Sequence, residues 1–162
     1  MSGTGTRTPL VYIIAGEASG DVLAAGLMQS LKRLTGGQVR FAGVGGDRMA
    51  AEGLTSLFPI SEMAVMGVFE ILPHAPKLLR RISQTVANIL DVQPDVLLTV
   101  DSKAFNLRVQ KRLYKRRAAG KNVSFPLVHM VAPTVWAWRP GRAKGISKFL
   151  DELLVLFPFE PS

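Results

Sequence analysis

The stretch PLVYIIAGEASGDVLAAGLMQSLKRL, residues 9–34, decides how the rest of the sequence is interpreted. Its apolar run at 10–15 is short and rich in β-branched and aromatic residues, which predicts a strand buried on both faces. A glycine-bracketed loop at 16–20 follows, and then a helix with Ser19 or Asp21 as its N-cap. Leucines spaced four, four and three apart predict the inner face of this helix: Leu23, Leu27, Leu31 and Leu34. Strand, loop and helix in this order are the opening unit of a doubly wound α/β sheet.

The loop of this unit is the first candidate site, because ligands of such sheets bind beyond the carboxyl ends of the strands. Glu17, Ser19 and Asp21 are expected at that edge. The spacing G-x-x-x-G differs from the dinucleotide fingerprint, and an acidic residue here would repel a pyrophosphate, so no nicotinamide or flavin site is expected. The alternative is that Glu17 and Asp21 only cap the helix and complement its dipole. We favour a functional role for Glu17.

The composition fits one domain with its own core, because 48% of the 162 residues are apolar. Cysteine is absent, which excludes disulfides and thiolate metal sites, and His74 and His129 lack a zinc-type spacing. Residues 1–8 are polar and expected to be disordered, without a signal peptide, and no apolar run is long enough to span a membrane. A cytoplasmic location is therefore expected. The net charge of +8 indicates an anionic partner: nucleic acid, a phosphorylated small molecule or an acidic membrane surface.

A second strand is predicted at 39–44, followed by a glycine pair and a short helix that ends at Glu52. Gly45 and Gly46 lie just after a strand end, where the backbone can approach a ligand closely. A tight turn is the alternative explanation of the pair. Residues 54–58 are expected to form a third, shorter strand.

Residues 61–72, SEMAVMGVFEIL, are predicted to form a helix that Pro73 ends. Its apolar residues cover nearly the whole circumference: Met63, Val65, Met66, Val68, Phe69, Ile71 and Leu72. Such a helix is either buried on all sides or exposes an apolar patch to a partner or a membrane. The cations that follow, Lys77, Arg80 and Arg81, would suit insertion into an anionic bilayer, and both alternatives stay open.

A second helix is predicted at 76–90, and a continuous apolar strand follows it at 95–100. Asp101 comes directly after this strand and is therefore a second carboxylate at the same edge as Glu17. Two carboxylates from different strand ends could divide acid–base and substrate-orienting work. The alternative is that Asp101 caps the next helix.

That next helix, 104–118, is strongly basic, and we interpret its cations chiefly as a solvated face. They are Arg108, Lys111, Arg112, Lys115, Arg116 and Arg117. Nucleic acid is not favoured as the partner, because no aromatic residues alternate with these cations to form a stacking platform.

The loop VAPTVWAWRPGR, residues 131–142, follows a strand predicted at 126–131 and contains both tryptophans of the chain. Trp136 and Trp138, beside Arg139 and a second arginine, could line a pocket for a sugar and a phosphate. Core packing is the alternative, above all for Trp136.

A short helix at 144–150 and a last strand at 153–157 complete the elements. Strands that alternate with helices predict one α/β domain with a doubly wound parallel sheet and right-handed crossovers.

Six segments, in this order, resemble the lipid-A-disaccharide synthase family. They are AGEASGD (15–21), GVGGDRM (43–49), SEMAVMGVFEIL (61–72), PDVLLTVDSKAFN (94–106), VHMVAPTVWAWRPGR (128–142) and LLVLFPFEP (153–161). The resemblance implies an inverting glycosyltransferase of the GT-B architecture, with two Rossmann-like domains. The implied reaction moves 2,3-diacylglucosamine from its UDP carrier (UDP-diacylglucosamine) to the 6-hydroxyl of lipid X, 2,3-diacylglucosamine 1-phosphate, and releases UDP. No metal or other cofactor is expected.

The resemblance also implies roles for particular residues. Asp101 matches the family's essential aspartate and would take the proton of the acceptor hydroxyl, and Glu17 matches a loop glutamate that helps to hold the acceptor sugar. Further acceptor-binding residues would be Ser19, Gly45, Gly46, Asn106, Trp136 and Arg139. Contact with the membrane or acyl chains would come from Met63, Val65, Met66, Val68, Phe69 and Leu72. The basic surplus would serve anionic phospholipid and the acceptor phosphate.

Three features depart from the family. Ala104 replaces an acidic residue of many members, so Asp101 carries more weight, and Met130 replaces a tyrosine with no consequence that we can assign. The family's chains are more than twice as long. We therefore expect residues 9–162 to be the acceptor-side domain, the donor-binding domain to be absent, and the chain alone to be nearly inactive. The expected location is cytoplasmic, at the surface of the inner membrane.

Three other functions stay open. Another nucleotide-sugar enzyme, such as an epimerase, would turn over a UDP-sugar without a lipid acceptor. A non-catalytic module would bind anionic membranes whether or not Asp101 is replaced. A nucleic-acid protein, the least favoured, would bind with a steep salt dependence.

Overall fold

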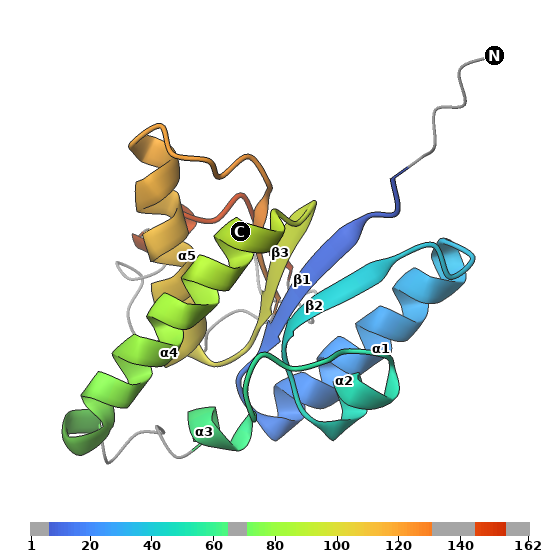
Figure 1. Ribbon diagram of the computed structural model, residues 1–162, viewed down its shortest axis with the longest axis horizontal. Coiled ribbons are helices and arrows are strands. Elements are labelled where there is room, and N and C mark those ends of the chain that lie inside the picture. The colour runs from blue at the N-terminus through green and yellow to red at the C-terminus, as the bar shows by residue number, and fades with distance from the viewer. Residues whose placement is uncertain (1–6, 65–70, 131–144, 155–162) are drawn as a thin grey trace.

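The computed structural model describes residues 7–64, 71–130 and 145–154, which form a parallel sheet between two helical layers (Figure 1). The sheet has the strand order β2-β1-β3-β4-β5, and every pairing is parallel. Its strands are β1 (Leu10–Ala15), β2 (Arg40–Val44), β3 (Val96–Val100), β4 (Leu127–Met130) and β5 (Glu152–Leu154). The order proceeds from β1 to β2 on one side and to β3, β4 and β5 on the other. The prediction of a doubly wound, Rossmann-like α/β sheet is confirmed.

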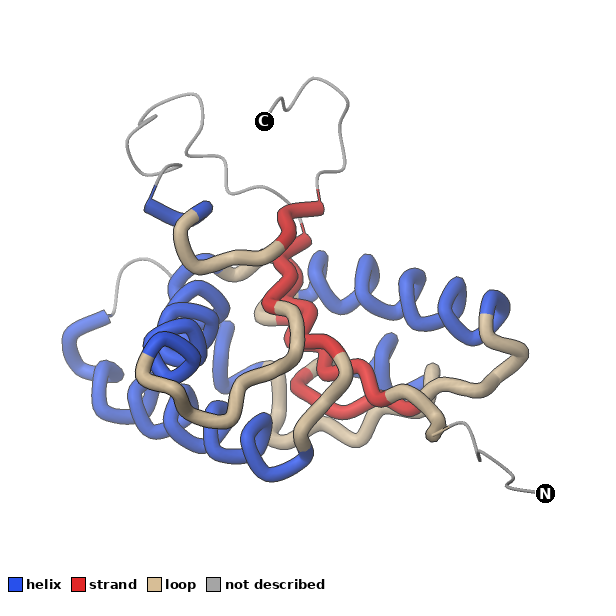
Figure 2. Tube along the Cα trace, turned by 90° about the horizontal axis from the view of Figure 1, so that it is seen from above, coloured by secondary structure: helices blue, strands red, loops and turns tan. Residues whose placement is uncertain are grey.

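The helices cover both faces of the sheet (Figure 2). One layer contains α1 (Ala18–Leu34) and α2 (Asp47–Ala51), and the other contains α4 (Ile71–Val92) and α5 (Lys103–Ala118), as Figure 1 shows. Alternate residues of β1 divide between the two cores. Tyr12 and Ile14 pack with α4 and α5, whereas Val11 and Ile13 pack with α1 and α2. All six residues of β1 are buried, as expected for a central strand with both faces covered.

The predicted N-cap of α1 is wrong, and its predicted inner face is only partly right. The helix begins at Ala18 with Glu17 as its N-cap residue. Its buried residues are small, except for one methionine: Gly20, Asp21, Ala24, Ala25 and Met28. Leu23, Leu27 and Leu31 are partly buried and pack against the same core, as predicted, whereas Leu34 is 83% exposed. Small side chains let the helix approach the sheet closely, since a Cβ atom on Gly20 would lie only 3.4 Å from the Val100 carbonyl oxygen.

The predicted end of a helix at Pro73 is also wrong, and residues 65–70 of the predicted helix at 61–72 lie outside the described ranges. A short helix, α3 (Ser61–Ala64), precedes residues that lie outside the described ranges, and α4 then begins at Ile71. Pro73 lies in the first turn of α4 and does not end a helix, because N–H groups of the first turn have no helical acceptor. Pro76 lies further inside α4 and removes one helical hydrogen bond.

Residues 54–58 form no strand, which corrects a third prediction. Only an isolated bridge joins Ser56 to Gly43 of β2. The Ser56 hydroxyl donates to the Phe58 carbonyl at 2.6 Å and bends the segment, while the Leu54 and Phe58 side chains anchor it in the two cores. Nearer the end of the described chain, residues 145–147 are helical and a turn follows them.

Candidate functional site

The loop after β1 and the loop after β3 touch each other at the carboxyl edge of the sheet. Gly16 is buried, and a Cβ atom on it would overlap the Ser102 side chain, so a larger residue at this position would push the two loops apart. The Met63 Cε atom lies 3.1 Å from the same Cβ position, so α3 closes the contact from a third side. This contact brings together the loops that carry Glu17 and Asp101.

Glu17 is exposed at the beginning of α1. Its backbone is extended, with φ −144° and ψ 163°, and its carbonyl accepts the Asp21 N–H at 2.9 Å. Its carboxylate makes no capping hydrogen bond, and it has no side-chain partner in the part of the chain that the structure describes. The interpretation of Glu17 as a capping side chain is therefore wrong. Ser19 is exposed in the first turn of α1, on the same loop.

Asp21 caps a helix, but the helix is α2 and not its own. Its buried carboxylate accepts three backbone N–H groups at the N-terminus of α2: those of Gly46 at 2.8 Å, Arg48 at 3.0 Å and Met49 at 3.2 Å. These bonds satisfy N–H groups that have no acceptor within α2. A Cβ atom on Gly46 would lie 2.6 Å from an Asp21 carboxylate oxygen, so the glycine lets the turn reach this carboxylate.

Gly45 is held in the same turn. Its N–H donates to the Ser56 hydroxyl at 3.1 Å, and a Cβ atom on it would overlap the Met49 side chain. Packing thus accounts for both glycines, as the tight-turn alternative expects.

Asp101 and Ser102 are two consecutive non-glycine residues in the left-handed region, with φ of 52° and 47°. Such a conformation costs about 1–2 kcal/mol for a residue with a side chain, so neighbouring contacts must hold it. The Asp101 N–H donates to the Met130 carbonyl at 3.2 Å and ties the turn to β4. Ser102, not Asp101, occupies the N-cap position of α5, and no side chain makes a capping bond there. The alternative role of Asp101 as a helix cap is therefore wrong.

The Asn106 side chain stabilises this turn by hydrogen bonds. Its side chain is fully buried, and its amide nitrogen donates to the carbonyls of Asp101 at 2.8 Å, Val100 at 3.0 Å and Ile14 at 3.5 Å. These carbonyls come from the carboxyl ends of β1 and β3. The Oδ1 atom of the same amide is buried and has no hydrogen-bond partner among the described residues.

A buried polar cluster lies next to the turn, and the sequence analysis missed it. His129 on β4 pairs in register with Thr99 on β3, and its Nδ1 atom lies 2.7 Å from the Thr99 hydroxyl. The Gln110 amide nitrogen donates to the same hydroxyl at 3.1 Å and to the Val128 carbonyl at 2.9 Å. Burial lowers the pKa of His129 to about 4, although the nearby Asp101 charge acts in the opposite direction, so the ring is neutral near pH 7.

An ion-pair cluster holds α3 against α4. The Glu62 carboxylate lies 2.6 Å from an Arg81 guanidinium nitrogen and 3.7 Å from the Lys77 ammonium. The hydrogen bond from Arg81 lowers the pKa of Glu62 below its usual value. The Arg81 guanidinium also lies over the Phe58 ring, 4.7 Å from its centre. Met63 is only 6% exposed and packs in the core of this layer, so it presents no exposed apolar surface.

The remaining predicted residues lie outside what the structure describes. These are Val65, Met66, Val68, Phe69, Trp136 and Arg139, together with the side chain of Leu72. Within the described ranges, no group of three or more acidic or histidine side chains is placed to hold a metal ion. Among these same residues, no helix combines the length and the apolar character needed to cross a bilayer.

The sequence of this chain is similar to those of known proteins of one family. Residues 11–162 match the family model described as lipid-A-disaccharide synthetase. The chain is 53% identical over 152 residues to the lipid-A-disaccharide synthase of Rhodospirillum centenum, an alignment that covers 94% of this chain and 37% of that protein. It is 52% identical to the synthase of Paramagnetospirillum magneticum and 51% identical to that of Alcanivorax borkumensis, over 94% of this chain and 38% of each protein. The chain thus spans well under half the length of these relatives.

Proposed function

This chain belongs to the lipid-A-disaccharide synthetase family, and we propose that it is the acceptor-side domain of an inverting glycosyltransferase of lipid A biosynthesis. Its acceptor would be lipid X and its donor UDP-2,3-diacylglucosamine, held mainly by a second, donor-binding domain. The observation that carries the proposal is the contact between Gly16 and Ser102, because it joins two loops that each bear a carboxylate.

The proposed chemistry is a single displacement with Asp101 as the general base. The acceptor 6-hydroxyl oxygen attacks the anomeric carbon of the donor sugar and transfers its proton to the Asp101 carboxylate. The bond between that carbon and the UDP oxygen breaks on the opposite side, UDP leaves with the electron pair, and the configuration inverts. A positioned base of this kind contributes about 10²–10⁴ in rate.

Asn106 is proposed as a positioning residue, not as an acceptor ligand. Its side chain is fully buried, and its amide nitrogen already donates to three backbone carbonyls. The bond to the Asp101 carbonyl supports a role in holding the left-handed turn, and with it the direction of the Asp101 carboxylate. Gly45 and Gly46 are proposed to shape the rim through the Asp21 contacts, and any bond to the acceptor would come from their backbone.

Glu17 is proposed to bind a hydroxyl of the acceptor sugar, with Ser19 beside it. The exposure of Glu17 and the absence of a partner for its carboxylate among the described residues support this role. Trp136 and Arg139 are proposed to complete the acceptor site, on the strength of the family motif alone.

We propose that the domain works at the cytoplasmic surface of the inner membrane. The apolar sequence around residues 65–70 supports this, together with the exposed Lys77 and Arg80 and the 48% exposed Leu79 on the first turns of α4. Cations next to an apolar segment suit an interface with anionic lipid.

Calorimetric titration of the 162-residue chain with lipid X in detergent, and separately with UDP, tests the proposal. We expect lipid X to bind and UDP to bind far more weakly. Glu17→Gln should weaken lipid X binding about tenfold, since a hydrogen bond to a charged group contributes about 1.5–3 kcal/mol.

Asp91→Asn is the matched control, because it removes another exposed carboxylate, near the end of α4, and it should leave lipid X binding unchanged. Binding of UDP without lipid X would contradict the proposed division of labour. Equal losses in the two variants would contradict the role of Glu17.

A further inference from the structure

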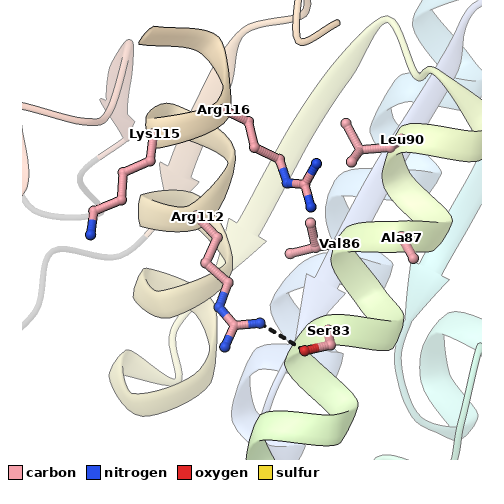
Figure 3. Close-up of a pocket in the computed structure, with 7 residues that line it drawn as sticks. All are labelled: Ser83, Val86, Ala87, Leu90, Arg112, Lys115 and Arg116. Atoms are coloured by element: carbon pink, nitrogen blue, oxygen red, sulfur yellow. Dashed lines mark hydrogen bonds between the residues drawn. The ribbon is translucent and has the colours of Figure 1, made fainter. Parts of the chain in front are cut away.

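A hollow of about 500 Å³ lies between α4 and α5, away from the carboxyl edge (Figure 3). We call it the α4–α5 groove, and it is lined by Ser83, Val86, Ala87, Leu90, Arg112, Lys115 and Arg116. Its α4 wall is mainly apolar, and its α5 wall is cationic. Figure 3 shows the guanidinium groups of Arg112 and Arg116 reaching from α5 toward α4, while the Lys115 side chain extends away from α4.

The two arginines of the groove have no carboxylate partner within the described residues. The Arg112 side chain donates only to the Ser83 hydroxyl, at 2.8 Å, and the Arg116 side chain makes no hydrogen bond or ion pair with the described residues. Their neighbour Arg117 is different, because it pairs with Asp151 at 2.9 Å and donates to the Phe125 carbonyl at 2.7 Å. Like charges four residues apart on a helix repel each other, so an anion between Arg112 and Arg116 would relieve this repulsion.

The charge of the chain is concentrated in this layer. Together α4 and α5 contain ten lysines and arginines and one carboxylate, Asp91, whereas the formal net charge of the whole chain is +8. The opposite layer, α1 and α2, contains three cations and two carboxylates. The α4–α5 layer therefore has the larger surplus of positive charge, which favours the binding of an anion there.

The groove combines this charge with an apolar strip. Val86, Ala87 and Leu90 lie at the i, i+1 and i+4 positions of α4, and the hollow is larger than a phosphate alone requires. Among the described residues no aromatic side chain lines it, so these residues offer no stacking surface to a nucleic acid base.

We propose that the α4–α5 groove binds the headgroup of an anionic phospholipid. The phosphodiester lies between Arg112 and Arg116, and the glycerol and the first methylene groups of the acyl chains lie on the apolar strip of α4. This site is separate from the proposed acceptor site at the carboxyl edge, and it would hold the α4–α5 layer against an anionic membrane.

Dihexanoyl phosphatidylglycerol below its critical micelle concentration is the probe, because it presents headgroup and chains without a membrane surface. Its binding to the 162-residue chain is followed by calorimetry and by amide chemical shifts. The double variant Arg112→Gln/Arg116→Gln should lose at least tenfold in affinity. The control Arg108→Gln/Lys111→Gln removes the same charge from the same helix outside the groove, and it should lose less than threefold.

Two further ligands test the parts of the proposal. Glycerol 3-phosphate has the anionic group without acyl chains, and dihexanoyl phosphatidylcholine has the chains without net charge, so both should bind more weakly than the probe. The groove variant should also reduce sedimentation with phosphatidylglycerol vesicles more than the control variant does.

Equal losses in the two double variants would overturn the proposal in favour of diffuse attraction. Binding of glycerol 3-phosphate as tight as that of the probe would overturn the role of the apolar strip. Binding of a single-stranded oligonucleotide through the two arginines, without lipid binding, would make nucleic acid the partner. Far-ultraviolet circular dichroism confirms that each variant is folded. Because the probe contains no sugar, its failure would leave the proposed acceptor site untouched.

Discussion

Replacing Asn106 with alanine tests whether a buried amide holds the turn of Asp101. The change removes the donor that serves the carbonyls of Asp101, Val100 and Ile14. The turn that loses these bonds contains two residues in the left-handed region. The change also removes the Asn106 Oδ1 atom, which is buried without a partner within the described ranges.

The expected loss follows from these contacts. The bonds of 2.8 and 3.0 Å contribute about 1 kcal/mol each, and the contact of 3.5 Å is too long to add much. The small cavity left by alanine adds to the loss, while removal of the unpaired Oδ1 atom offsets part of it. We expect Asn106→Ala to lower the free energy of unfolding by about 2 kcal/mol.

Urea denaturation at pH 7 measures this difference. Asn122→Ala changes an exposed asparagine in a loop and should cost less than about 0.5 kcal/mol. Asn106→Asp keeps the shape but turns an ionised carboxylate toward carbonyl oxygens, so at pH 7 it should cost more than the alanine variant. That excess should shrink at acidic pH, where the protonated carboxyl can donate. An Asn106→Asp chain as stable as the parent at pH 7 would refute the assignment of the amide nitrogen as the donor.

Three further predictions concern stability. Gly16→Ala should lower the free energy of unfolding by about 1–3 kcal/mol, because the new Cβ atom would overlap Ser102. Gly26→Ala, in open space on α1, should raise it by up to about 1 kcal/mol. Thermal unfolding measures whether the midpoint temperature falls in the first variant and rises in the second. Asp21→Ala should cost about 2 kcal/mol and speed hydrogen exchange at the first amides of α2, which lose their acceptor. The pKa of His129 is about 4 in the folded chain and 6.5 in the unfolded chain, so the unfolded chain takes up a proton on this ring at a higher pH. Stability is therefore lost as the pH falls from 6.5 to 4. His129→Gln should remove about 3 kcal/mol of that loss, as measured by urea denaturation at a series of pH values.

The sheet could be predicted from the sequence because its central strands are buried on both faces. Such strands are continuous apolar runs, and the predicted bounds of β1 agree with the structure, while those of β3 differ by one residue. Residues 54–58, LTSLF, are also mainly apolar, but the Ser56 hydroxyl bends the chain after one bridge to β2. Composition therefore predicts burial in both cases, whereas strand formation also needs a straight backbone beside a free sheet edge.

The helix boundaries show a similar limit. Proline ends a helix only where its missing N–H would have been used, and this depends on where the helix begins. Pro73 follows an apolar segment and predicts an end, yet it lies in the first turn of α4, where the N–H is not needed.

Part of the candidate site could be predicted because the ends of parallel strands meet at one edge. This argument is enough to predict that the loops of Glu17 and Asp101 lie close together. It does not identify the contacts that hold these loops in place. The partners of Asp21 lie 25 to 28 residues away on α2, and the pairing of His129 with Thr99 depends on the register of two strands that no local pattern determines.

The basic helix α5 shows most clearly what tertiary contacts add. The sequence gives no reason to distinguish its six cations after Lys103, and it suggests that all of them form a solvated face. In the structure these cations differ. Arg117 pairs with Asp151 and donates to the Phe125 carbonyl just before β4, whereas Arg112 and Arg116 border an apolar strip that has no carboxylate. A cation that is already neutralised stabilises the fold, and one that is not remains available to an outside anion. Replacing Arg117 should therefore reduce stability, whereas replacing Arg112 and Arg116 should reduce lipid binding, and this difference separates the structural cations of α5 from those proposed to bind.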